Sequence, residues 1–131
     1  MFTLSNASEY AILFLVKLAG NKNKKPLSLK QITVKAKLPY KFLSRIVLDL
    51  KKAGIITSKG GVTGGYLLNK NPKNINLMQI IKAVEGNKGF VSCIHGQCAM
   101  EKPCHHKKVW QKLQQIIEKE FEKVKLSNLI K

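Results

Sequence analysis

The sequence predicts a mainly α-helical protein that carries one small β-hairpin. Apolar residues recur every three or four positions before residue 54 and again after residue 76, which is the period of an amphipathic helix. Between these segments the period shortens to two, and a glycine-rich stretch interrupts the alternation. This combination is typical of two short strands joined by a turn.

The first two helices follow from capping residues and apolar spacing. Ser5 or Asn6 can cap a helix over residues 5–18, and Gly20 ends it. Its inward face has apolar residues at helical spacing: Ala7, Tyr10, Ala11, Phe14 and Leu18. Ser28 caps a second helix, which we predict over residues 29–36.

The third helix runs from Pro39 to about Ala53, and Gly54 ends it. Proline is favoured at a helix start because its missing N–H needs no partner there. The predicted apolar stripe consists of Phe42, Leu43, Ile46, Val47 and Leu50. Strands over residues 55–59 and 66–68 then form a hairpin around a glycine-rich tip.

The C-terminal part of the chain contains two further helices. Asn76 caps one over residues 77–84, and Gly86 ends it. A long last helix begins around Cys104 or His105, and its apolar residues again recur at helical spacing: Val109, Trp110, Leu113, Ile116, Ile117, Phe121 and Val124.

The size of the chain, 131 residues and 14.7 kDa, fits one domain with a modest core. Its apolar runs are shorter than the roughly 18 residues that a membrane span needs. The first residues lack the basic and apolar segments of a secretory signal. We therefore expect a cytoplasmic protein without a membrane anchor, in a compartment that keeps cysteines reduced.

The charge is strongly basic, with 24 Lys and Arg residues against 7 Asp and Glu residues and a net charge of +17. Such an excess favours a polyanionic partner, with nucleic acid before an anionic membrane surface. A lysine-biased composition is the alternative, because Arg45 is the one arginine among these 24 residues. The excess is nevertheless uneven, since residues 1–70 contain 13 basic and only 2 acidic residues.

The order of two helices, a short turn, a third helix and a hairpin is that of a winged helix-turn-helix. The third helix of this motif enters the major groove of DNA, and the hairpin, or wing, lies on the backbone. Residues 1–75 then form a DNA-binding domain, with the wing at about residues 55–68. The alternatives are a charged face that is merely solvated and a wing that contacts another protein.

The predicted DNA-binding residues lie on the outward side of the third helix and at the root of the wing. We expect the first group to meet base edges because recognition helices read bases with their first turns: Tyr40, Ser44 and Arg45. We expect the second group to contact phosphates: Lys41, Lys51 and Lys59.

All three cysteines, Cys93, Cys98 and Cys104, lie within twelve residues. Reduced, clustered thiols are typical of a metal site or a redox sensor rather than of disulfides. A tetrahedral metal site or an iron–sulfur cluster normally takes four protein ligands, so one ligand must come from elsewhere. Zinc and a switch made of thiols alone remain alternatives to iron.

Three features in order resemble one family. They are an opening Leu4-Ser5-x-x-x-Glu9-Tyr10-Ala11, the run from Leu50 to Ile56 leading to Gly64-Gly65-Tyr66-Leu67-Leu68, and the cysteine segment. Together they resemble the iron–sulfur winged-helix transcription regulators of the IscR and NsrR type. The resemblance implies a homodimer on a partly palindromic DNA operator, with the C-terminal helix crossing its partner. Residues 76–131 would then hold the cluster-binding segment, at about residues 90–105, and the dimerisation helix.

The resemblance also suggests the fourth ligand. In IscR-type members a histidine lies three residues after the last cysteine, but Lys107 occupies that position here. His105 and His106 are close by in a shifted register. In NsrR-like members with two irons, an acidic residue of the first helix reaches the cluster of the other subunit, and Glu9 matches it. We favour Glu9 of the partner subunit. The alternatives are His105 or His106, and after them a small molecule, water or no fourth ligand.

The predicted function is a DNA-binding transcriptional regulator, with a repressor favoured over an activator. Its operator affinity would depend on an iron–sulfur cluster, 2Fe-2S favoured and 4Fe-4S possible, that senses nitric oxide, redox state or iron–sulfur status. The alternatives are a zinc-bound or thiol-redox regulator and a protein-interaction module. No enzyme is expected, because no nucleophile–base pair or nucleotide-binding loop can be assembled. The operator, the signal and any RNA polymerase contact stay open.

Overall fold

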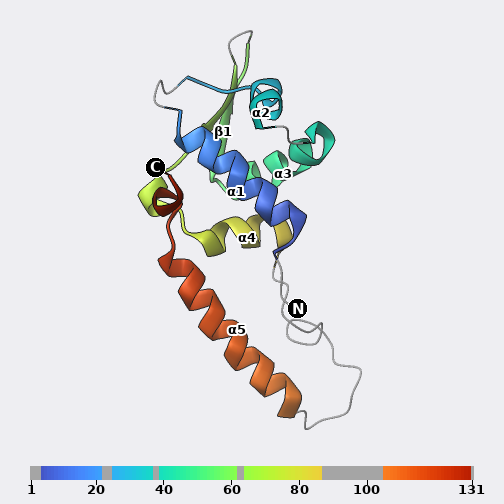
Figure 1. Cartoon of the computed structure of the whole chain (residues 1–131), viewed down its shortest axis with the longest axis vertical. Helices are drawn as coiled ribbons and strands as arrows, with labels where there is room; N and C mark the ends of the chain where they lie inside the picture. The colour runs from blue at the N-terminus through green and yellow to red at the C-terminus, as the bar shows by residue number, and fades with distance from the viewer. Residues whose placement is uncertain (1–3, 22–24, 37–38, 62–63, 87–104, 131) are drawn as a thin grey trace.

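The computed structural model describes residues 4–21, 25–36, 39–61, 64–86 and 105–130 (Figure 1). Helices α1 to α4 and a two-stranded hairpin form one body, and α5 extends away from it (Figure 1). No helix among these residues is long and apolar enough to cross a membrane. The mainly helical fold with one hairpin is therefore confirmed.

Helix α1 spans Asn6–Ala19 and supplies the centre of the core. The Ser5 hydroxyl caps it by accepting a hydrogen bond from the Ser8 N–H, at 3.2 Å. Glu9 lies one position beyond the place at which a capping box requires an acidic side chain, so it takes no part in the cap. Ala11, Phe14 and Leu15 are fully buried, as the apolar spacing requires.

Helices α2 (Leu29–Ala36) and α3 (Tyr40–Lys52) form the helix-turn-helix pair. Ser28 and Gln31 form a reciprocal cap at the start of α2, in which each backbone N–H donates to the other side chain. Pro39 is the N-cap of α3, and Ala53 is its C-cap. The buried stripe of α3 packs against α1, α2 and α4 and consists of Leu43, Ile46, Val47 and Leu50.

The wing consists of β1 (Ile56–Lys59) and β2 (Gly65–Leu68), paired antiparallel with Ile56 opposite Leu68. Leu27 adds a bridge to Tyr66 on the other edge of β2, through hydrogen bonds of 2.8 and 3.1 Å. This bridge explains Gly65, because a Cβ there would meet the Leu27 backbone at 2.5 Å. The hairpin therefore joins the segment before α2.

Helix α4 (Leu77–Glu85) lies beneath α1 and α3, and Asn76 and Gln79 form a capping box at its start. Helix α5 (His105–Lys123) then leads back to the body, where short 3-10 turns at Pro72–Asn74 and Leu126–Leu129 pack together. The Leu126 N–H donates to the Ile75 carbonyl, at 2.8 Å, and the Leu126 side chain is fully buried. The C-terminal segment therefore belongs to the core.

Candidate nucleic-acid interface and metal centre

The outward face of α3 carries the side chains expected to contact DNA. Tyr40, Lys41 and Arg45 are exposed and Ser44 is half-buried, on the side opposite the buried stripe. The Ser44 hydroxyl donates to the Lys41 carbonyl, at 2.8 Å, so this hydroxyl is hydrogen-bonded within its own helix. The structure therefore presents these four residues together on the first turns of α3.

The cations around this face have no ion-pair partner among the described residues. The two ion pairs in this part of the chain join Lys82 to Glu118 and Lys123 to Glu120. The face itself keeps its charges exposed and uncompensated: Lys41, Arg45, Lys51, Lys52 and Lys59. A set of unpaired cations on a helix and the adjoining wing root is the electrostatic pattern that a phosphate backbone requires.

Phe42 differs from the expectation that it belongs to the buried stripe. Its side chain is 40% exposed and packs edge-on against Tyr10 of α1, with ring centroids 5.3 Å apart. The reason is geometric, because residue 42 lies at the edge of a stripe centred on residues 43, 46, 47 and 50. Phe42 therefore covers the α1–α3 contact from outside.

The wing tip depends on Gly64, because a side chain at this position would clash with the backbone. A Cβ at Gly64 would lie 2.3 Å from the Lys59 carbonyl oxygen and 2.7 Å from the Gly60 backbone. Any larger residue at position 64 must therefore shift the turn that follows β1. Since Lys59 ends β1 at this turn, Gly64 also determines where Lys59 is presented.

The cysteine segment lies outside the described residues, and so do the side chains of His105 and His106. Within the described part, no three His, Cys, Asp or Glu side chains come together as a metal site. Lys107, at the position of the IscR-type histidine, lies in the first turn of α5 and is half-buried. The ligand set Cys93, Cys98, Cys104 and Glu9 therefore stays a prediction.

Glu9 lies in the first turn of α1 with an exposed side chain. Among the described residues its carboxylate has no hydrogen-bond or ion-pair partner. A carboxylate that is already paired would have to break that pair before binding a metal. The Glu9 side chain has no such obstacle in this part of the chain.

Sequence reasoning missed a hydrogen bond next to Glu9. The Ser8 hydroxyl donates to the Glu85 carboxylate at the end of α4, at 2.8 Å. The available signals were a serine on the apolar face of α1, in line with Ala11 and Leu15, and an acidic residue directly before Gly86. Neither signal alone predicts a contact between residues 77 positions apart.

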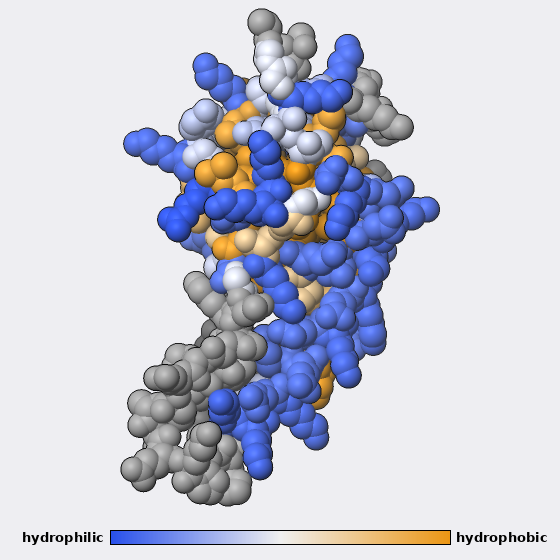
Figure 2. Space-filling view, turned by 180° about the vertical axis from the view of Figure 1, so that it is seen from behind, coloured by the Kyte–Doolittle hydropathy of each residue, from blue (hydrophilic) through white to orange (hydrophobic). Residues whose placement is uncertain are grey.

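Helix α5 exposes an apolar stripe that the described part of its own chain leaves uncovered. Val109, Leu113 and Ile116 are 57%, 41% and 49% exposed and recur at helical spacing. The opposite side of α5 packs on α4, where Lys82 and Glu118 are 3.9 Å apart. Figure 2 shows α5 covered by hydrophilic side chains from behind, with an apolar spot at its edge.

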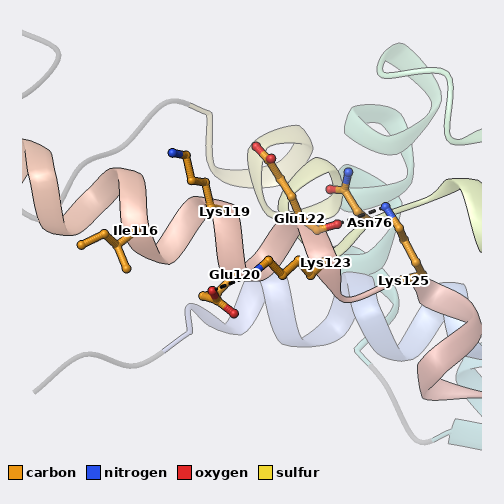
Figure 3. Close-up of a pocket in the computed structure, with 7 residues that line it drawn as sticks. All are labelled: Asn76, Ile116, Lys119, Glu120, Glu122, Lys123 and Lys125. Carbon is orange, nitrogen blue, oxygen red and sulfur yellow. Dashed lines mark hydrogen bonds and ion pairs between the residues drawn. The ribbon is translucent and has the colours of Figure 1, made fainter.

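A shallow pocket lies where the end of α5 meets the start of α4 (Figure 3). Ile116 and six polar residues line it: Asn76, Lys119, Glu120, Glu122, Lys123 and Lys125. Its close contacts are local, since Lys123 bonds Glu120 at 3.0 Å and Lys125 bonds the Glu122 carbonyl at 3.1 Å. These residues offer no soft metal ligand and no nucleophile paired with a base.

Fold and interface together define a winged helix-turn-helix protein with a long C-terminal helix. The chain matches the sequence family described as Rrf2, iron-dependent transcriptional regulator, over residues 4–131. It belongs to this family of DNA-binding transcriptional regulators, which confirms the resemblance drawn from its motifs.

Two of its relatives illustrate the range of the family. The regulator NsrR of Shouchella clausii is 29% identical over 109 residues, which cover 81% of this chain and 73% of that protein. CymR of Bacillus subtilis, the global cysteine regulator, has a solved structure that is 26% identical. It superposes with a TM-score of 0.78, covering 98% of this chain and 96% of that one.

A third relative is the IscR of T. potens, whose solved structure is 26% identical with a TM-score of 0.77. The match covers 98% of this chain and 85% of that one. CymR and IscR superpose almost equally well on this chain. The fold therefore does not distinguish between these two relatives.

Proposed function

We propose that this protein is a cytoplasmic regulator, acting as a repressor, that binds a partly palindromic operator as a homodimer. The observation that carries the proposal is the cationic face formed by α3 and the wing root, whose charges have no ion-pair partner among the described residues. Tyr40, Ser44 and Arg45 read bases in the major groove, and Lys41, Lys51 and Lys59 contact phosphates. The Ser44 hydroxyl releases the Lys41 carbonyl when it turns towards a base.

The exposed stripe of α5 supports the homodimer. Three large apolar side chains on one helical face are expected to be covered by another surface. A second copy supplies an identical stripe, and two-fold symmetry then places two α3 helices to read two half-sites. The α5 helix therefore sets the spacing of the DNA-reading helices.

We further propose that operator affinity depends on an iron–sulfur cluster held by Cys93, Cys98, Cys104 and Glu9 of the partner subunit. The donor chemistry fits, because thiolates hold such clusters and the Glu9 carboxylate, which has no partner among the residues that the structure describes, can complete the set. His105 and His106 are the alternative fourth ligands. When bound, such a cluster, 2Fe-2S or alternatively 4Fe-4S, would supply a redox-active centre sensitive to oxygen and nitric oxide.

Anaerobic purification followed by visible absorption and by iron, sulfide and zinc analysis tests the cluster. We expect a coloured protein with iron and sulfide in equal amounts. A colourless, iron-free protein with one zinc per chain would contradict the proposal. The Glu9→Ala variant should then lose its visible absorption faster than the wild type while it stays a dimer. An unchanged spectrum would instead assign the fourth ligand to His105 or His106.

A cysteine-dependent regulator without iron is the second candidate function. It stays beside the cluster proposal because CymR, the global cysteine regulator of B. subtilis, superposes on this chain as well as IscR does. In that case Cys93, Cys98 and Cys104 would act as reversible thiols. Operator binding would then change with thiol oxidant and reductant in a preparation free of iron and zinc, which the cluster proposal does not expect.

A further inference from the structure

Ser8 is the one polar side chain among the described residues that is fully buried, with 0% exposure. Burial of a hydroxyl is unfavourable unless the hydroxyl finds a hydrogen-bond partner. Its partner is the Glu85 carboxylate, at 2.8 Å, which makes the hydrogen bond charge-assisted. This bond joins the first turn of α1 to the last residue of α4.

The position of Glu85 is not explained by its own helix. A carboxylate in the last turn of a helix is disfavoured by the helix dipole, whereas one beside a helix N-terminus is favoured. Glu85 ends α4 and contacts the third residue of α1, so α1 compensates for the unfavourable placement. Figure 1 shows these two helix ends side by side.

Each residue of this pair leads towards one part of the proposed metal centre. Glu9 follows Ser8 in the same turn of α1, so the orientation of that turn determines where the Glu9 carboxylate points. Gly86 follows Glu85 with a φ of +74°, and it ends α4 seven residues before Cys93. The pair therefore connects the helix that presents Glu9 to the point at which the cysteine-bearing segment begins.

We propose that Ser8 and Glu85 are a positioning pair that couples the two ends of the metal centre. The proposal rests on the proposed function. In a dimer with Glu9 acting on the partner subunit, each pair links the ligand given to the partner's cluster to the root of the chain's own cysteine segment. The hydrogen bond keeps both groups in register and thereby slows cluster loss.

The test compares cluster half-lives in air for the full-length dimer, followed by visible absorption. Ser8→Ala and Glu85→Ala should each shorten the half-life roughly tenfold, which corresponds to loss of one charge-assisted hydrogen bond. Glu85→Gln retains an acceptor oxygen and should stay within about threefold of the wild type. Ile56→Val is the control, because it trims a buried side chain of β1 and leaves the pair intact.

A second readout needs no cluster. In the metal-free protein, Glu85→Ala should raise amide hydrogen exchange in the first turn of α1, and Ser8→Ala should raise it in the last turn of α4. Suppose that the wild-type protein holds iron and that the cluster half-lives of Ser8→Ala and Glu85→Ala equal that of Ile56→Val. This result would overturn the positioning role and leave the proposed function intact. A wild-type protein without iron would instead overturn the proposed function and the positioning role with it.

Discussion

Helices α3 and α5 are both amphipathic, yet they use their apolar faces differently. The four stripe residues of α3 are at most 3% exposed, because α1, α2 and α4 enclose them. The α5 stripe of Val109, Leu113 and Ile116 is 41–57% exposed. The apolar face of α3 is therefore covered by its own chain and its polar side is exposed, whereas the apolar stripe of α5 is exposed in the described part of the chain.

Truncation of a buried leucine in the α3 stripe should have the largest effect, because this stripe is enclosed by the protein's own helices. Leu50→Ala leaves a cavity among fully buried side chains and should lower the free energy of unfolding by about 2–5 kcal/mol. Urea denaturation measures this loss. Leu48→Ala is the matched control, since Leu48 is 58% exposed on the same helix and should cost less than about 0.5 kcal/mol. Equal losses would contradict the burial of the stripe.

A charge in the exposed α5 stripe should instead weaken the proposed dimer. Leu113→Asp places a carboxylate in an apolar contact and should weaken the dimer roughly tenfold or more, because a buried charge without a partner is unfavourable. Sedimentation equilibrium measures the dissociation constant. Gln115→Asp adds the same charge at an exposed position off the stripe and should leave the dimer unchanged. An unchanged dissociation constant in Leu113→Asp would show that the α5 stripe faces solvent.

Truncation of Arg45, one of the cations of α3, tests the polar face of this helix. Arg45→Ala should weaken operator binding by about 1–3 kcal/mol and relax the preference at one base position. Lys17→Ala is the control, because it removes an exposed cation from the end of α1. Operator affinity is measured by fluorescence anisotropy at one salt concentration. Equal losses of affinity in both variants would show that binding depends on net charge alone.

The smallest effect concerns the junction between the two regions. Asn76→Ala removes the side chain that caps α4, and it should lower the free energy of unfolding by about 1 kcal/mol. Asn74→Ala, two residues earlier and exposed, should change little. Thermal unfolding of both variants measures the difference. Equal destabilisation by Asn76→Ala and Asn74→Ala would show that the capping hydrogen bond of Asn76 is not the cause.

The helices and the wing could be predicted from the sequence because their signals are local. Ser28 and Asn76 cap α2 and α4 as expected, and the predicted helix ends lie within about two residues of those observed. The return of Leu126 to the core could not be predicted. Its partner Ile75 is distant in sequence, and one leucine in a polar tail has no periodicity.

The candidate sites divide in the same way. The helical spacing of apolar residues along α3 predicts which side carries Tyr40, Lys41 and Arg45, and the structure confirms that these three side chains are exposed. The Ser8–Glu85 hydrogen bond could not be predicted, because it depends on how α1 and α4 pack. The role of Phe42 was assigned to the core, since periodicity alone does not separate the edge of a stripe from its centre.

The central claim is that the cysteine segment and α5 control how the two α3 helices meet DNA. Its most direct test is the affinity of one preparation for its operator duplex, measured by fluorescence anisotropy before and after anaerobic removal of iron. An affinity difference of roughly 5- to 150-fold is expected, the range of ordinary coupling between two sites. Equal affinities of the iron-loaded and iron-free dimers would contradict the account.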